Sequence, residues 1–230
     1  MNSTRILTGL AAVFGLAAAS TPALAESKPN WTATVAVAED GTHTLGNPDA
    51  KVKISEFVSY TCPHCASFQK EAEAPLRLAY VQPGTVSVRI VHFIRDTVDL
   101  NVTMLVNCGD PAGFFARHHI FLQSQDQWLD KIQKMSDAQK ARWNGDDFAA
   151  SMRAITSDMG FYEVMEHRGY SRVEVDRCLA DTAIARKVLA QKEEGLRLGI
   201  PGTPSFMIND AVSDDAYDWR TLDNAIKARL

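Results

Sequence analysis

Two cysteines separated by two residues, Cys62-Pro63-His64-Cys65, follow a strand-like segment and open a helix-like one. Residues 52–58 read Val-Lys-Ile-Ser-Glu-Phe-Val and begin with the apolar–polar alternation that is typical of a β-strand. From Pro63 onwards, apolar residues recur at helical spacing, and proline fits the first turn of a helix. The sequence therefore predicts that both cysteines share one face at the start of a helix, where their sulfurs can meet.

The segments around this motif have two different characters. Strand-like stretches occur before and after a long central block, whereas the block itself is rich in helix formers and contains no convincing strand. This order predicts an α/β sheet domain that is discontinuous in sequence because an all-helical domain is inserted into it. We expect the sheet domain to comprise residues 26–96 and 181–230 and the helical insertion to comprise residues 97–180.

Three shorter features refine this prediction. The alternating segment Trp31–Ala38 indicates an edge strand. Pro75 should kink or split the helix that begins near Cys62, because proline removes a helical hydrogen bond. Asn209 and Asp210 favour a tight turn after a short strand at 205–208, since both residues tolerate a positive φ.

The first 25 residues have the pattern of a secretory signal peptide. Arg5 precedes an apolar run from Ile6 to Ala19, and the sequence Ala23-Leu24-Ala25 resembles a cleavage site. The run has 14 residues, whereas a membrane span needs about 20. We expect cleavage after Ala25 and a periplasmic location; an uncleaved N-terminal anchor is the alternative.

Charge composition limits the partners of this chain. The 24 basic and 28 acidic residues give a formal net charge of −4, and lysine and arginine do not cluster. Binding to nucleic acid or to an anionic membrane surface is therefore not expected. We expect no cofactor and no metal ion.

The four cysteines are interpreted in the context of export, because disulfides persist in oxidising compartments. At a helix start, unpaired N–H groups and the helix dipole favour a thiolate on Cys62, and a protonated His64 would add positive charge. A lowered thiolate pKa stabilises the dithiol, so the disulfide becomes an oxidant. Cys62 is therefore predicted to be the reacting sulfur and Cys65 the resolving one. Half of a zinc site or a structural disulfide remain alternatives for this pair.

The other two cysteines, Cys108 and Cys178, both lie in the helical block. Cys108 extends an apolar helix face that includes Leu100 and Met104, and Cys178 adjoins Val175 on another helix. Packing of the two faces would bring the sulfurs together, which predicts a structural disulfide. Two separate buried thiols are the alternative.

Two segments resemble the DsbA-like branch of the thioredoxin superfamily. The stretch from Glu56 to Cys65 is similar to that family's active-site segment, and the stretch from Gly199 to Phe206 is similar to its cis-proline loop. The helical block resembles the insertion of DsbA-like proteins, so the resemblance covers roughly residues 52–230. It implies a thioredoxin-like fold with an inserted all-helical domain, thiol–disulfide exchange activity and an oxidising disulfide.

The resemblance also implies roles for individual residues. Pro204 would follow a cis peptide bond and pack against the cysteine pair, and Thr203 would offer its backbone to an extended substrate. Glu56 would be the acid buried beneath the active site that helps proton transfer to and from Cys65; a salt-bridged strand residue is the alternative. Arg89 is a candidate charge partner for Glu56.

The function expected from these features is the oxidation of reduced or unfolded exported polypeptides by a monomeric enzyme. The resemblance further implies that a membrane protein reoxidises this enzyme. The Cys-Pro-His-Cys centre resembles that of oxidases, whereas a threonine before the cis-proline is commoner in isomerase-like members. Only about 25 residues separate Glu26 from the first motif strand, which leaves little room for the dimerisation segment of such isomerases. An isomerase or reductase, or a non-catalytic binder of unfolded chains, are the alternatives.

Overall fold

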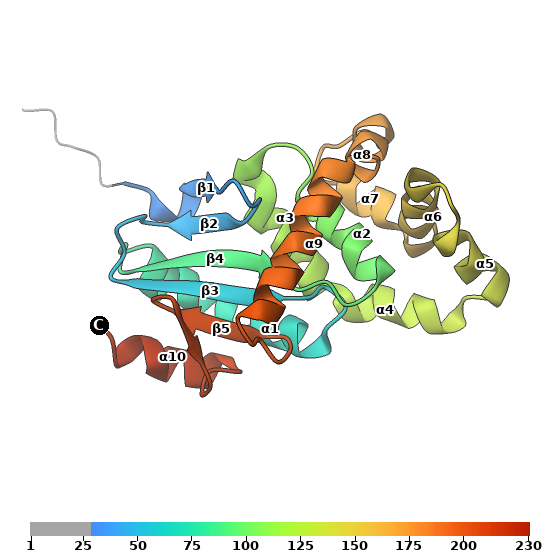
Figure 1. Cartoon of the computed structure of the whole chain (residues 1–230). Coiled ribbons are helices and arrows are strands. Elements are labelled where there is room, and N and C mark those ends of the chain that lie inside the picture. The colour runs from blue at the N-terminus through green and yellow to red at the C-terminus, as the bar shows by residue number, and fades with distance from the viewer. Residues whose placement is uncertain (1–28) are drawn as a thin grey trace, which may run out of the picture.

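A six-stranded mixed sheet forms the centre of the computed structural model, which describes residues 29–230 (Figure 1). The strand order is β1-β2-β4-β3-β5-β6. The signal peptide predicted for residues 1–25 lies outside the described residues. Among residues 29–230, no helix combines the length and the apolar character needed to cross a bilayer.

The two longest strands lie side by side at the centre of the sheet. β3 (Val52–Val58) and β4 (Val86–His92) run parallel, and both are rich in buried, β-branched residues, as expected for strands covered on both faces. All other pairings are antiparallel. The remaining strands are β1 (Val35–Val37), β2 (His43–Gly46), β5 (Ser205–Ile208) and β6 (Ala211–Ser213).

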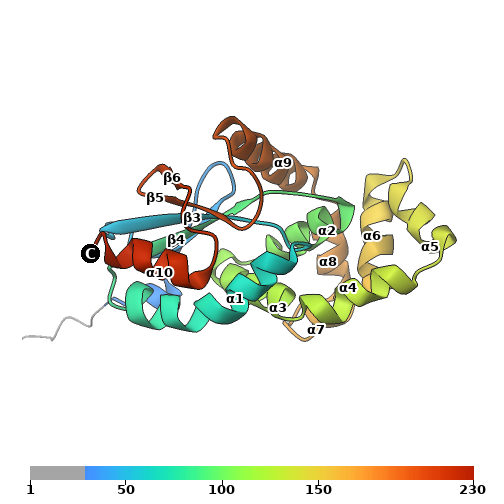
Figure 2. The same ribbon diagram turned by 90° about the horizontal axis from the view of Figure 1, so that it is seen from below.

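Helices cover both faces of this sheet. Figure 2 shows α1 (Pro63–Pro75) and α10 (Trp219–Lys227) on one face and α9 (Thr182–Arg197) on the other. α10 begins with a capping box in which Asp218 and Thr221 satisfy each other's backbone N–H groups. It then buries Leu222 and Ile226, four residues apart on one face, as the sequence pattern predicts.

The residues between β4 and α9 form the helical block, which extends beyond one end of the sheet (Figures 1 and 2). Four of its seven α-helices begin at a residue whose side-chain oxygen caps the helix; for example, Asp96 accepts a hydrogen bond from the Asp99 N–H at 2.9 Å, and Ser171 caps through a capping box with Glu174. The helices are α2 (Thr97–Val106), α3 (Phe114–Gln123), α4 (Gln125–Lys134), α5 (Asp137–Ala141), α6 (Phe148–Met159), α7 (Phe161–Glu166) and α8 (Arg172–Leu179), with short 3₁₀ turns at Pro111–Gly113 and Arg142–Asn144.

α2 is buried around its whole circumference. Every residue from Val98 to Val106 is buried, because α2 packs against α3, α6, α8 and α9. The sequence indicated one apolar face on this segment, whereas in the structure all faces of the helix are buried. Polar side chains on the other faces are buried as well: Asn101 donates to the Met152 carbonyl oxygen at 2.8 Å and to the Thr156 hydroxyl at 3.0 Å.

Three short strands differ from the sequence predictions, whereas the predictions for Pro75 and for the turn at Asn209 and Asp210 are confirmed. The edge strand is shorter than predicted, because Trp31–Ala33 form a 3₁₀ turn and only Val35–Val37 pair with β2. β2 and β6, with four and three residues, were not predicted. At Pro75 the α-helix ends, as the predicted split requires, and a π-helix, Leu76–Val81, continues the chain. Asn209 and Asp210 do form the tight turn, with φ values of 50° and 67°.

A disulfide joins Cys108, just after α2, to Cys178 in α8, as the sequence predicted. The two Cα atoms are 5.5 Å apart, within the usual range for a disulfide. The hydroxyl of Tyr170 donates to the Cys108 carbonyl oxygen at 3.2 Å, which further connects the two segments. The bridge therefore ties the start of the helical block to its end.

We expect the double variant Cys108→Ala, Cys178→Ala to be less stable than the wild type. The bridge spans 70 residues of sequence, and a loop of this size constrains the unfolded chain by up to about 4 kcal/mol. Urea unfolding of both proteins, with Cys62 and Cys65 reduced in each, measures the loss. Equal unfolding free energies would contradict a stabilising role for the bridge.

Candidate active site

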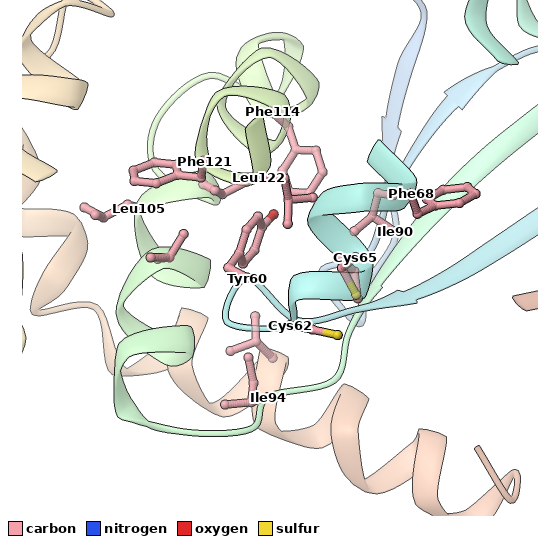
Figure 3. Close-up of a cluster of buried hydrophobic side chains, with 14 of the residues drawn as sticks. Tyr60, Cys62, Cys65, Phe68, Ile90, Ile94, Leu105, Phe114, Phe121 and Leu122 are labelled. Atoms are coloured by element: carbon pink, nitrogen blue, oxygen red, sulfur yellow. The ribbon is translucent and has the colours of Figure 1, made fainter. Parts of the chain in front are cut away.

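Cys62 is the N-cap residue of α1, and Cys65 lies in its first turn. The Cys62 carbonyl oxygen accepts hydrogen bonds from the N–H groups of Cys65 and Ala66, at 3.1 and 3.3 Å. Pro63 is the first helical residue and therefore leaves no N–H unpaired. Figure 3 shows the two cysteine side chains at this helix start, with Tyr60 pointing away from them towards Phe114 and Leu122. The local geometry is the one that the spacing predicts.

The surroundings of Cys62 favour a thiolate. A hydrogen bond from the Cys65 thiol, a contact with Thr203 and the backbone N–H groups of Cys65 and His64 lower the pKa of Cys62 from 9.0 to about 5, although burial acts in the opposite direction. Cys62 is 3% exposed, so these donors largely replace water around the sulfur. The Cys62 side chain is therefore ionised at neutral pH.

Cys65 has the opposite character. It is fully buried, and burial, together with its hydrogen bond to Cys62 and the Cys62 charge, raises the pKa of Cys65 well above its ordinary value. One sulfur of the pair is therefore a thiolate and the other a thiol. The low pKa makes Cys62 a good leaving group whenever it is bonded to a substrate sulfur.

The loop between α9 and β5 brings Thr203 against Cys62. The Thr203–Pro204 peptide bond is cis, and the Cys62 Sγ lies 3.1 Å from the Thr203 carbonyl oxygen, to which Cys62 donates when it carries its proton. A pocket of about 520 Å³ lies on the Cys62 side of this loop, with Arg95 and Phe93 in its wall. A second pocket, of about 320 Å³, lies on the Tyr217 side, and the segment Pro201–Thr203 lines both.

Glu56 is buried on the sheet near the cysteines. It is 2% exposed, its Oε1 has no hydrogen-bond partner among the described residues, and burial raises the pKa of Glu56 to about 8. Its charge, when present, raises the pKa of Cys65, so the two groups interact. Glu56 therefore carries a proton at neutral pH and could exchange it with Cys65.

The proposed pairing of Arg89 with Glu56 is wrong. In the parallel register Arg89 is opposite Ser55, and its Nε donates to the Ser55 hydroxyl at 3.0 Å. Side chains alternate between the faces of a strand, so Ser55 and Glu56 point to opposite sides of the sheet. Within residues 29–230 Glu56 forms no salt bridge, which also removes the alternative of a salt-bridged strand residue.

A cavity of about 280 Å³ borders Glu56 between the sheet, α1 and α3. His118 lies in its wall and accepts or donates hydrogen bonds with the Tyr60 hydroxyl, at 2.8 Å, and with Gln69, at 3.2 Å. Gln69 in turn contacts His119 at 3.2 Å. Polar groups thus continue from the interior near Glu56 to the half-buried His119.

Three residues that the sequence analysis did not identify fix the segment before Cys62. Asp99 accepts from the Tyr60 N–H at 2.7 Å, and Asp96 accepts from the Thr61 hydroxyl at 2.6 Å. Gln125 donates to the carbonyl oxygens of Tyr60 and Cys62, at 2.6 and 2.9 Å. The only sequence signal among them is Asp96, which precedes an apolar run as a helix cap does.

Metal binding finds no support in the side-chain arrangement. Over residues 29–230, His, Cys, Asp and Glu side chains do not gather in groups of three or more that could hold an ion. Cys62 and Cys65 are 40 or more residues from the other two cysteines, which are bonded to each other. The pair is therefore not half of a four-cysteine zinc site.

His64 is exposed beside Cys62, and we expect it to act through its charge. In a His64→Ala variant the side chain at this position can no longer carry a positive charge, so the Cys62 thiolate pKa should rise and the disulfide should become less oxidising. Thiolate absorbance followed against pH in both proteins tests this. An unchanged titration would mean that the hydrogen-bond donors at the helix start set the pKa without His64.

Glu56 should make the folded protein less stable as pH rises. Its pKa is raised on folding, so the folded state holds the proton more tightly, and stability is lost between about pH 4.5 and pH 8. A Glu56→Gln variant should therefore gain stability relative to the wild type over this interval, by up to about 1.4 kcal/mol per pH unit. Urea unfolding from pH 5 to pH 9 measures this difference; a difference that does not change with pH would contradict an ionisable, buried Glu56.

Comparisons with known proteins agree with the fold. The thioredoxin family model matches residues 38–228. A crystal structure named as a protein-disulfide isomerase from Novosphingobium aromaticivorans is 43% identical, with a TM-score of 0.79, and the match covers 83% of this chain and 97% of that one. Wolbachia pipientis alpha-DsbA1 shares the fold at 20% identity, with a TM-score of 0.64 over 81% of this chain and 89% of its own.

Curated sequences give the same assignment at lower identity. A protein of Rickettsia bellii, provisionally named a protein-disulfide oxidoreductase, is 27% identical over 190 residues, which are 82% of this chain and 64% of the relative. The chain thus spans less than two thirds of that relative's length. The family model and the Novosphingobium structure agree, and the chain belongs to the thioredoxin family.

Proposed function

We propose that this chain is an exported disulfide oxidase, which donates the Cys62–Cys65 disulfide to reduced polypeptides. The observation that carries this proposal is that the pKa of Cys62 is lowered whereas the pKa of Cys65 is raised. A lowered Cys62 pKa stabilises the dithiol relative to the disulfide. The disulfide is therefore readily given to a substrate, and each pKa unit of stabilisation corresponds to about 30 mV in a two-electron couple.

The first step is attack by a substrate thiolate on the Cys62 sulfur. A bond forms between the substrate sulfur and Cys62, the Cys62–Cys65 bond breaks, and Cys65 leaves as a thiolate. Because Cys65 is buried, its thiolate needs a proton. Glu56 is protonated at neutral pH and is the group proposed to supply it.

The second step releases the oxidised substrate. A second substrate thiolate attacks the substrate sulfur of the mixed disulfide, and Cys62 leaves as a thiolate. The donors around Cys62 stabilise this leaving group, which makes release fast. Two electrons pass from the substrate to the enzyme, which ends as a dithiol and must be reoxidised; a membrane protein is the proposed oxidant.

The substrate proposed is an extended or unfolded polypeptide. Thr203 presents its backbone beside Cys62, and the pockets on either side of Pro201–Thr203 offer room for the side chains that flank a substrate cysteine. Phe93 and Tyr217 supply apolar surface in the two pockets. We further propose that the enzyme acts as a monomer in the periplasm after cleavage at Ala25.

A disulfide isomerase is the second candidate. The Novosphingobium structure that is 43% identical carries the name isomerase, and Thr203 precedes the cis-proline as in isomerase-like members. The two functions differ in the resting redox state. An oxidase isolated from its compartment under acid quench should have Cys62 and Cys65 mostly bonded, whereas an isomerase should have them mostly as thiols.

Variants of the two cysteines test the chemistry. Cys62→Ala should abolish oxidation of a reduced model protein, because no sulfur remains to be attacked. Cys65→Ala should accumulate mixed disulfides that form when the Cys62 thiolate attacks a disulfide of an oxidised substrate, because Cys65 is then absent and cannot resolve them. Oxidation assays and non-reducing gels measure both effects.

The same variants address the non-catalytic alternative. A binder of unfolded chains should suppress aggregation of a denatured protein equally well with and without Cys62. Oxidase activity that survives Cys62→Ala would refute the assignment of the reacting sulfur.

A further inference from the structure

Gln125 is the first residue of α4 and is buried, although α4 is otherwise largely exposed. Within this helix the buried residues are Gln125 and Trp128. Burying a side-chain amide is costly unless its hydrogen bonds are made. The amide of Gln125 makes two, and both acceptors lie in the segment that ends at the redox centre.

The two acceptors are the carbonyl oxygens of Tyr60 and Cys62, at 2.6 and 2.9 Å from the Gln125 Nε2. The Cys62 carbonyl is the first of α1 and also accepts from the N–H groups of Cys65 and Ala66. Its orientation therefore sets the direction in which the first N–H groups of α1 point. A donor from another helix thus helps to fix the start of α1.

Asp99 holds the same segment from the other side. It accepts hydrogen bonds from the Tyr60 N–H at 2.7 Å and from the Arg95 N–H at 2.9 Å. The Tyr60 N–H is therefore bound by Asp99 and the Tyr60 carbonyl oxygen by Gln125, and both of these residues belong to the helical block. The Tyr60 hydroxyl is held by His118 of α3. α2, α3 and α4 therefore all contact a segment that ends two residues later at Cys62.

We propose that Gln125 is a positioning residue for the redox centre: its amide holds the Tyr60–Cys62 segment so that the Cys62 sulfur stays beside the first N–H groups of α1. Two effects of this contact have the same sign. The amide hydrogens place partial positive charge against two carbonyl oxygens near the thiolate, and the fixed backbone keeps the donors of His64 and Cys65 aligned with the sulfur. The helical insertion thereby helps to set the stability of the thiolate.

This inference deepens the proposed function, since it takes Cys62 as the reacting sulfur. Gln125→Met, which keeps the length and removes the donors, should raise the Cys62 thiolate pKa by about one unit. The equilibrium constant for exchange with glutathione should move about tenfold towards a less oxidising disulfide. Gln125→Asn keeps one amide on a shorter side chain, so it should shift both quantities less, in the same direction.

A matched control separates positioning from stability. Asn101 is a buried amide of the same block that donates to Met152 and Thr156 instead of to the redox segment. Asn101→Leu should lower the free energy of unfolding by an amount similar to Gln125→Met and leave the thiolate titration unchanged. The folded fraction of each variant is monitored by circular dichroism.

The outcomes distinguish this inference from the proposed function. If the wild-type Cys62 titrates like an ordinary thiol, the proposed function fails. If the wild-type pKa is lowered but neither Gln125 variant changes it, or if Asn101→Leu changes it equally, the positioning role of Gln125 is refuted.

Discussion

The chemistry of this protein depends on a balance between burial and hydrogen bonding at one sulfur. Burial of Cys62 alone would raise its pKa, yet the donors at the start of α1, with Cys65 and Thr203, lower it to about 5. Those donors act only if α1 begins at Pro63 and if the loop of Thr203 lies against the sulfur. The parallel pair β3 and β4, the antiparallel β5 and the packing of α1 on the sheet all serve this juxtaposition.

The helical block contributes to the same balance from outside the sheet domain. Between β3 and α1 the backbone N–H of Tyr60 donates to Asp99 and the Tyr60 carbonyl oxygen accepts from Gln125, so the redox segment is held between two structural units. The disulfide between Cys108 and Cys178 joins the ends of α2 and α8 and limits how far the block can open. A covalent bridge away from the redox centre therefore stabilises the helices that contact it.

The features that were predicted correctly from the sequence are those that depend on residues close together in the chain. The spacing of Cys62 and Cys65, the proline at position 63 and the apolar face from Phe68 onwards require only helical geometry, and the structure agrees with each. β2, with four residues, was not predicted because its strand character depends on pairing with β4, in which Ile90, the partner of His43, lies 47 residues later in the chain. The contact between Arg89 and Ser55 could not be predicted either. A shift of one residue in the pairing of β3 with β4 would place Arg89 opposite Glu56 instead of Ser55, and the sequence does not specify this register.

The role of Gln125 could not be predicted from the sequence. Its two hydrogen bonds go to backbone carbonyl oxygens, which every residue possesses, so no partner side chain marks the contact in the sequence. Glu56 is the opposite case: the resemblance identified it, but its raised pKa arises from burial, with Oε1 unpartnered among the described residues, rather than from a charge partner. An acid kept neutral by burial can donate a proton to the buried Cys65 without leaving a stable ion pair behind, whereas a partner such as Arg89 would have held it ionised. The absence of that pairing within residues 29–230 is therefore consistent with the proton transfer that we propose for Glu56.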